Sequence, residues 1–74
     1  MIPDDEARKY HSLIEGAWRF FRRSAKPAGE ALTQNDLDTM CDGVFRITHD
    51  APPELAEFAA ELMQVITDEI QRRQ

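Results

Sequence analysis

The chain has 74 residues, of which 42% are hydrophobic and 31% are charged, and its formal net charge is −5. This length supports one domain at most, and this much apolar material argues against disorder. The single cysteine excludes an internal disulfide. The acidic start lacks the features of a signal peptide, and no apolar run is long enough to cross a bilayer. We therefore expect one domain over residues 1–74, located in the cytoplasm, without membrane association.

The first predicted helix covers about residues 4–25. At about 100° per residue, its apolar side chains share an arc of about 160°, and most of its charged side chains take the opposite side. Acidic residues open the segment and basic residues close it, which suits the helix dipole. Pro27 disfavours helical geometry at Lys26, so the helix is expected to end by about Ala25.

The second predicted helix covers about residues 34–48. Thr33 is the expected N-cap, with Asp36 in the capping-box position. Gly43 falls on the face opposite the apolar residues, where it could split the helix. Cys41 is expected to face the core. The apolar face consists of Leu37, Met40, Cys41, Val44, Phe45 and Ile47.

The third predicted helix covers about residues 53–73. Asp50 is a candidate N-cap, and Pro52 and Pro53 suit a first helical turn. The helix carries a wide apolar stripe that includes Leu55, Phe58, Ala59, Leu62, Met63, Val65, Ile66 and Ile70.

Three striped helices with short connectors predict an all-α three-helix bundle, with two long helices and a shorter middle one. The apolar arcs are wide enough to leave an oligomer interface beyond the shared core. If Trp18 is buried, Trp18→Ala is expected to cost about 3–5 kcal/mol. The predicted core consists of Ile14, Trp18, Phe21, Leu37, Val44, Phe58, Leu62 and Ile66.

Charge is distributed unevenly along the chain. Residues 8–26 hold six basic residues and one acidic residue, whereas residues 27–74 hold three basic and ten acidic residues. One interpretation is a solvated basic face that balances the acidic helices. A second is a phosphate-contacting surface for nucleic acid, although the negative net charge weakens long-range attraction. A third is an acidic surface on the second and third helices that imitates nucleic acid. The candidate nucleic-acid contacts are Arg8, Arg19, Arg22, Arg23 and Lys26.

No pattern in the sequence indicates catalysis or a resident cofactor. His11 and Glu15 have the i,i+4 spacing of metal ligands, but two ligands on one helix do not make a site. There is no nucleophile beside a base and no phosphate-binding glycine loop. We therefore expect neither enzyme activity nor a metal or cofactor.

Residues 10–23 read YHSLIEGAWRFFRR. This segment resembles the first helix of small helical proteins encoded by phages and integrated elements of gut-type bacteria, which also carry a tryptophan and paired aromatic residues followed by basic ones. The resemblance implies a mobile-element accessory protein that acts by binding, and it assigns no functional residue. The leading hypothesis is thus a bacterial protein–protein interaction module, and a homodimer is its simplest form.

Overall fold

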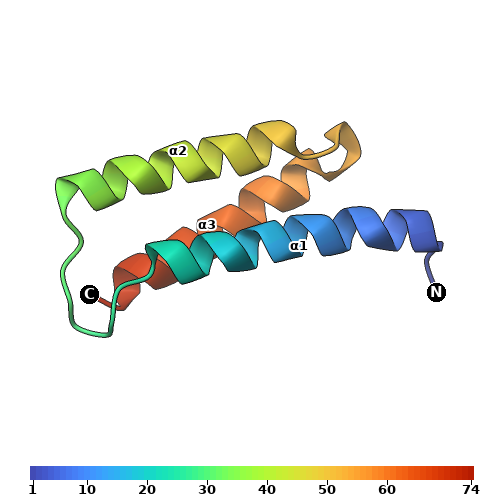
Figure 1. Ribbon diagram of the computed structural model, residues 1–74. Helices are drawn as coiled ribbons and strands as arrows, with labels where there is room; N and C mark the ends of the chain where they lie inside the picture. The colour runs from blue at the N-terminus through green and yellow to red at the C-terminus, as the bar shows by residue number, and fades with distance from the viewer.

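The computed structural model describes residues 1–74 and has three α-helices. They are α1 (Asp4–Ser24), α2 (Gln34–Asp50) and α3 (Ala56–Arg72), and a 3-10 helix, η1 (Pro53–Leu55), leads into α3. The helices α1 and α3 run in the same direction, and α2 runs antiparallel to both (Figure 1). Each helix packs against the other two. The predicted all-α three-helix fold is therefore confirmed.

The helix boundaries differ from the predicted ones mainly around the second connector. The helix α2 continues to Asp50, two residues past the predicted end, so Asp50 closes a helix and does not cap the next one. Ala51 has an extended backbone, with φ −64° and ψ 145°, because a residue before proline is disfavoured in the helical region. Pro52 is the N-cap residue of η1, and α3 begins at Ala56.

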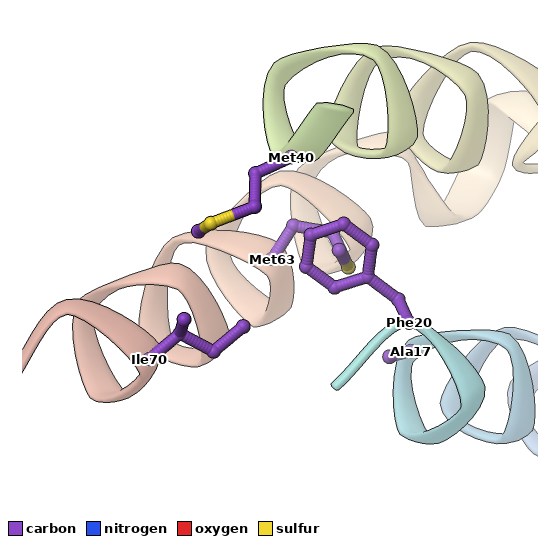
Figure 2. Packing of buried hydrophobic residues seen from close by; sticks show 5 residues of the cluster. All are labelled: Ala17, Phe20, Met40, Met63 and Ile70. Atoms are coloured by element: carbon purple, nitrogen blue, oxygen red, sulfur yellow. The ribbon is translucent and has the colours of Figure 1, made fainter. Parts of the chain in front are cut away.

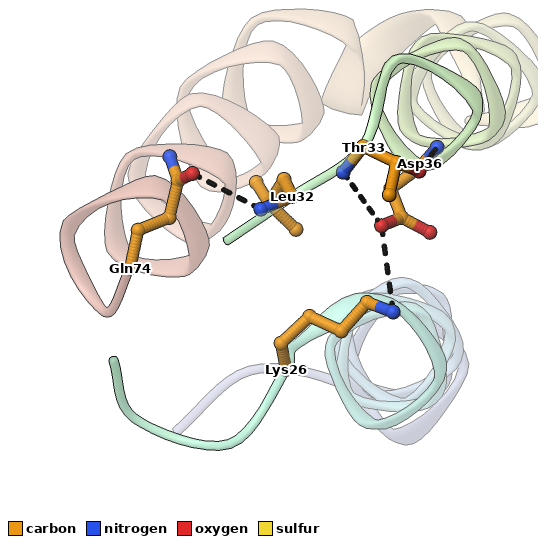
Figure 3. A network of polar contacts seen from close by, with 5 residues as sticks. All are labelled: Lys26, Leu32, Thr33, Asp36 and Gln74. Atoms are coloured by element: carbon orange, nitrogen blue, oxygen red, sulfur yellow. Dashed lines mark hydrogen bonds and ion pairs between the residues drawn. The ribbon is translucent and has the colours of Figure 1, made fainter. Parts of the chain in front are cut away.

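The N-terminus of α2 is closed by the predicted capping box. The Asp36 N–H donates to the Thr33 hydroxyl at 3.1 Å, and the Thr33 N–H donates to the Asp36 carboxylate at 2.9 Å. The Lys26 ammonium lies 3.4 Å from the same carboxylate, which ties the end of α1 to the start of α2 (Figure 3). Two N–H groups that would otherwise lack partners are thus satisfied by side chains.

The connector between α1 and α2 is held by the C-terminal end of α3. The Gly29 N–H donates to the Arg73 carbonyl at 2.7 Å, and the Leu32 N–H donates to Gln74 Oε1 at 3.1 Å (Figure 3). Arg73 in turn donates from Nη2 to the Lys26 carbonyl at 3.1 Å. Gly29 has a φ of +85°, a conformation that costs little only for glycine. These bonds close one end of the bundle.

The capping box makes stability depend on pH. The hydrogen bonds from Thr33, followed by the charge of Lys26, hold the pKa of Asp36 below its ordinary value. The pKa of Asp36 is therefore lower in the folded chain than in the unfolded chain. The capping box contributes fully to stability above the ordinary carboxyl pKa of about 3.9, and this contribution is lost as the pH falls through the pKa of Asp36 in the folded chain. We therefore expect the melting temperature to fall below about pH 4, and Asp36→Asn to reduce that fall while lowering the melting temperature at pH 7.

Thermal unfolding followed by circular dichroism measures both effects. Asp42→Asn is the matched control, because Asp42 lies on the same helix and takes part in no hydrogen bond of the capping box. An acid profile that is the same in Asp36→Asn as in the parent chain would contradict the prediction.

The core consists of two adjoining clusters of buried side chains. Ala17 and Phe20 of α1 meet Met40 of α2 and Met63 and Ile70 of α3 in the first cluster (Figure 2). Leu13, Leu55 and Ala59 form the second cluster, near η1. The predicted core residues Phe21, Leu37, Val44, Phe58, Leu62 and Ile66 pack around these clusters but are only partly buried.

The prediction that Ile14 and Trp18 lie in the core is wrong. Ile14 and Trp18 expose 49% and 55% of their surface, whereas Ala17 and Phe20 expose 1% and 2%. The buried row of α1 therefore lies one residue earlier than the predicted row. The physical reason is the close approach of the helices, which places the small Ala17 at the centre of the contact and displaces the indole to its edge.

The predictions for Gly43 and Cys41 are also wrong. The helix α2 runs through Gly43 without a break, and this glycine faces α1. A Cβ atom built there would lie 2.6 Å from Phe20 Cε1, so the phenylalanine ring occupies the space that a side chain would need. Cys41 is exposed, because α2 turns the other edge of its apolar face toward the core.

Candidate interaction surfaces

Three of the large apolar side chains that are exposed to solvent lie on α1 and α3. Ile14 and Trp18 of α1 are about half exposed, and Val65 of α3 is 66% exposed. Between them lie Phe21 and Leu62, which pack against the core with one side and remain partly open. We call this surface the Trp18 face; it consists of Ile14, Trp18, Phe21, Leu62 and Val65.

The Trp18 face follows from the parallel arrangement of α1 and α3. Tyr10 and Phe58 meet edge to face across the two helices, with ring centres 5.3 Å apart. From Tyr10, one row of α1 continues through Ile14 to Trp18 at steps of four residues. From Phe58, a row of α3 continues through Leu62 to Val65. Because both rows start at one contact and run in the same direction (Figure 1), they line the same face of the bundle.

Trp18 is held in place by its neighbours on α1. Its ring stacks on Phe21 with centres 6.2 Å apart, and the Arg22 guanidinium lies 6.0 Å from the indole centre. Phe21 packs against the core with its other side, so the indole rests on a partly buried ring. A large aromatic side chain held in one orientation loses little conformational freedom on binding.

The two borders of the Trp18 face carry opposite charge. We place residues around each helix at about 100° per residue. The edge of the Trp18 face that lies on α1, away from α3, is its outer border on α1; it holds Arg8, Arg19 and Arg22 and one acidic residue, Glu15. The outer border on α3 holds Glu57, Glu61 and Asp68 with Arg72 as the basic residue. Arg19 is paired with Glu15 at 2.6 Å, whereas Arg8 and Arg22 take part in no ion pair.

A second surface is a groove between α1 and α2. It consists of two adjoining depressions of about 430 and 640 Å³ that share Gly16 and Ile47. Leu13, Ala51 and Pro52 add apolar lining, and Ser12 and Asp50 add polar lining. The basic side chains that line it are Lys9, Arg19, Arg22, Arg23 and Arg46. We call this surface the α1/α2 groove.

The structure brings some of the predicted nucleic-acid contacts together and places the others elsewhere. Arg19, Arg22 and Arg23 line the α1/α2 groove together. Arg8 lies near the start of α1, outside the groove, and Lys26 is engaged with the Asp36 carboxylate. The sequence interpretation missed Arg46, which lines the groove from α2. Its position on the face of α2 that turns toward α1 becomes visible only when the two helices are packed.

Lys9 closes one end of the α1/α2 groove and is already paired. Its ammonium lies 2.7 Å from Glu54 at the start of η1. This hydrogen bond raises the pKa of Lys9 and lowers the pKa of Glu54. The pair links the N-terminal half of α1 to η1 across the surface, so Lys9 already has a carboxylate partner at this end.

A third, smaller depression lies between α2 and α3. It measures about 340 Å³ and is lined mainly by apolar side chains, with Thr67 and Gln71 on the α3 side. Phe45 is its one large exposed apolar side chain, at 68%, and its ring lies 5.4 Å from the His49 ring. The remaining candidate ligand pair, His11 and Glu15, is on the surface of α1 with 3.8 Å between Nδ1 and Oε2.

These features define a class of protein: a small three-helix domain with an exposed aromatic face and an adjoining basic groove. Comparison with protein-family models, curated proteins and solved structures gives no match for the chain. None of its helices combines the length and the apolar character that crossing a bilayer requires.

Proposed function

We propose that the chain is a protein–protein interaction module that acts by binding and not by catalysis, and that its Trp18 face associates with a second copy. The observation that carries this proposal is the exposure of Ile14, Trp18 and Val65, which the Tyr10–Phe58 contact and the helical spacing assign to one face. A group of exposed apolar side chains on a small domain is typical of a contact surface. Tryptophan is also among the residues that contribute most to interface affinity.

A second copy fits this face by shape and by charge. A two-fold axis parallel to the helices places α1 of one copy against α3 of the other. In that arrangement, the basic border on α1 faces the acidic border on α3 of the partner copy, and each dimer contains this contact twice. Association would also remove apolar surface from water in a chain with only eight buried residues, where oligomerisation is a common source of stability.

Self-association is tested by sedimentation equilibrium between about 1 µM and 1 mM, a range that covers weak dimers. We expect a monomer–dimer equilibrium with a dissociation constant in the micromolar range. Trp18 is the only tryptophan, so its emission should shift to shorter wavelength as the dimer forms. Trp18→Ser should leave a folded monomer throughout this range.

Phe45→Ser is the matched control for Trp18→Ser. Phe45 is at least as exposed as Trp18, but it lies on the α2/α3 side, so its replacement should not change the dissociation constant. A parent chain that remains monomeric at high micromolar concentration would contradict self-association. Equal weakening by Phe45→Ser would show that association is unspecific and does not use the Trp18 face.

The resemblance of residues 10–23 to phage and integrated-element proteins supports a finer proposal. We propose that the module is an accessory protein of a mobile element. Genomic neighbourhood is the test: the coding sequence is expected among genes of an integrated phage or a related element. A position within an operon of metabolic genes would contradict it.

A further inference from the structure

We propose that the α1/α2 groove binds an acidic amphipathic segment of a partner protein. The groove opens toward α2 and the Trp18 face toward α3, but Arg19 and Arg22 border both, so the two surfaces are neighbours on α1. The proposal rests on the lining of the groove and not on self-association. Its apolar lining consists of Leu13, Gly16, Ile47, Ala51 and Pro52. Five basic side chains and one acidic side chain, Asp50, border this lining.

Three of the groove arginines have no carboxylate partner within the chain. Arg22, Arg23 and Arg46 take part in none of the ion pairs, whereas Lys9 and Arg19 are paired with Glu54 and Glu15. Unpaired guanidinium groups are notable in a chain with a net charge of −5. The planar guanidinium group matches the geometry of a carboxylate and can bind it through two hydrogen bonds. Carboxylates on a partner would find donors here that no ion pair occupies. Arg22 also lies over the Trp18 ring, and Arg23 and Arg46 also line a neighbouring depression that contains Asp36 and Asp42.

Gly16 provides room for the backbone of the partner. A Cβ atom built at Gly16 would meet no atom within 4 Å, so packing within the chain does not need a glycine at this position. Glycine in the interior of a helix costs about 1 kcal/mol relative to alanine. Its effect on the surface is to deepen the groove where the two depressions meet, and this allows another chain to approach α1 closely.

The lining favours a peptide over nucleic acid. No aromatic side chain lines the two depressions, so the groove lacks the stacking surfaces on which single-stranded bases are held. Its apolar strip matches the apolar side of an amphipathic helix, flanked by glutamates that would reach the arginines.

The probe is a fluorescein-labelled synthetic helical peptide of about 15 residues. It carries a row of leucines at helical spacing between two rows of glutamates. Fluorescence anisotropy with the full chain should give a dissociation constant in the micromolar range. Arg23→Glu should weaken binding at least about tenfold, because it replaces an attraction by a repulsion. Gly16→Leu, which fills the lining of the groove, should weaken it by a similar factor.

Arg8→Glu is the matched control for peptide binding, since Arg8 is an exposed, unpaired arginine of the same helix outside the groove. Because Arg8 also borders the Trp18 face, self-association of this variant is measured separately. It should retain the affinity of the parent chain to within about twofold. A peptide with lysine in place of glutamate should bind the parent chain at least about tenfold more weakly and should bind Arg23→Glu better than the parent. Melting curves confirm that each variant is folded.

Three results would overturn the proposal. The first is no binding of the acidic peptide at about 100 µM chain, which exceeds the expected dissociation constant severalfold. The second is equal weakening by Arg8→Glu and Arg23→Glu, which would indicate only general charge attraction. The third is a labelled DNA or RNA oligonucleotide that binds more tightly than the peptide and displaces it, which would assign the groove to nucleic acid.

Discussion

Phe20→Ala is expected to lower the free energy of unfolding by about 3–5 kcal/mol, whereas Trp18→Ala should lower it by about 1 kcal/mol or less. Phe20 is 2% exposed and packs among the buried side chains of all three helices, as Figure 2 shows. Its removal leaves a cavity next to Gly43, which has no side chain to fill it. A domain of this size has only a few kcal/mol of stability, so Phe20→Ala should be largely unfolded.

Trp18 is the larger side chain, but it is 55% exposed. Its contacts in the isolated chain are the stack on Phe21 and the approach of Arg22. Far-UV circular dichroism during urea unfolding measures both variants. The measurement is made at low micromolar concentration, so that loss of self-association does not add to the cost of Trp18→Ala.

The opposite result would reverse the assignment of the core. If Trp18→Ala unfolds and Phe20→Ala remains folded, α1 is rotated by about one residue and Trp18 lies inside, as its position in the apolar stripe predicts. The Trp18 face would then not exist, and the proposed dimer would have no surface. The pair of variants therefore tests both the packing of α1 and the basis of the proposed function.

The number and order of the helices could be predicted because those signals are local. Pro27, the Thr33–Asp36 capping box and the pair Pro52–Pro53 mark helix ends within a few residues of chain. The capping box formed as predicted. The end of α2 was misplaced by two residues because an aspartate before a proline pair has two interpretations: it can cap the helix that follows or, as here, close the helix that precedes.

The centre of the core could not be predicted because the apolar stripe of each helix is wider than the part of the helix that the other helices bury. On α1, Ile14 and Trp18 lie within the same stripe as Leu13 and Ala17, and periodicity does not distinguish them. The distance between the helix axes decides which residues of the stripe are buried. A short distance favours small residues where two helices meet, such as Ala17 and Ala59. Choosing large side chains for the centre therefore placed Ile14 and Trp18 inside, when they lie at the edge.

The candidate surfaces depend on tertiary structure in the same way. The basic character of α1 is visible in the sequence, but Arg46 belongs to a largely acidic segment. Only the packing of α2 against α1 brings it to the groove that Arg23 also lines. Val65 likewise belongs to the apolar stripe of α3, and only the rotation of α3 in the bundle, which buries Ala59 and Met63, leaves it exposed.

The two helical glycines should respond differently to the same substitution. Gly43→Ala is expected to be less stable than Gly16→Ala by about 1–3 kcal/mol. Both gain about 1 kcal/mol from the higher helix propensity of alanine, so this gain cancels in the comparison. What remains is the packing cost at Gly43, where a Cβ atom would lie 2.6 and 2.8 Å from two ring carbons of Phe20.

The cost at Gly43 cannot be relieved by a small movement of the ring. Phe20 is enclosed by Met40 and Met63, so it must leave its position or α2 must move away from α1. Gly16 has open space where a Cβ atom would lie, so Gly16→Ala should be more stable than the parent chain by up to about 1 kcal/mol. Urea unfolding of the two variants gives the difference.

A third variant separates a local clash from a general effect of Gly43→Ala. Phe20→Leu shortens the side chain that occupies the space above Gly43, so the double variant should be more stable than the sum of the two single effects predicts. Additive effects, or a Gly43→Ala variant as stable as Gly16→Ala, would mean that α1 and α2 are not in close contact at this point. The α1/α2 groove would then be wider than described, and Arg23 and Arg46 would be too far apart to contact one ligand together.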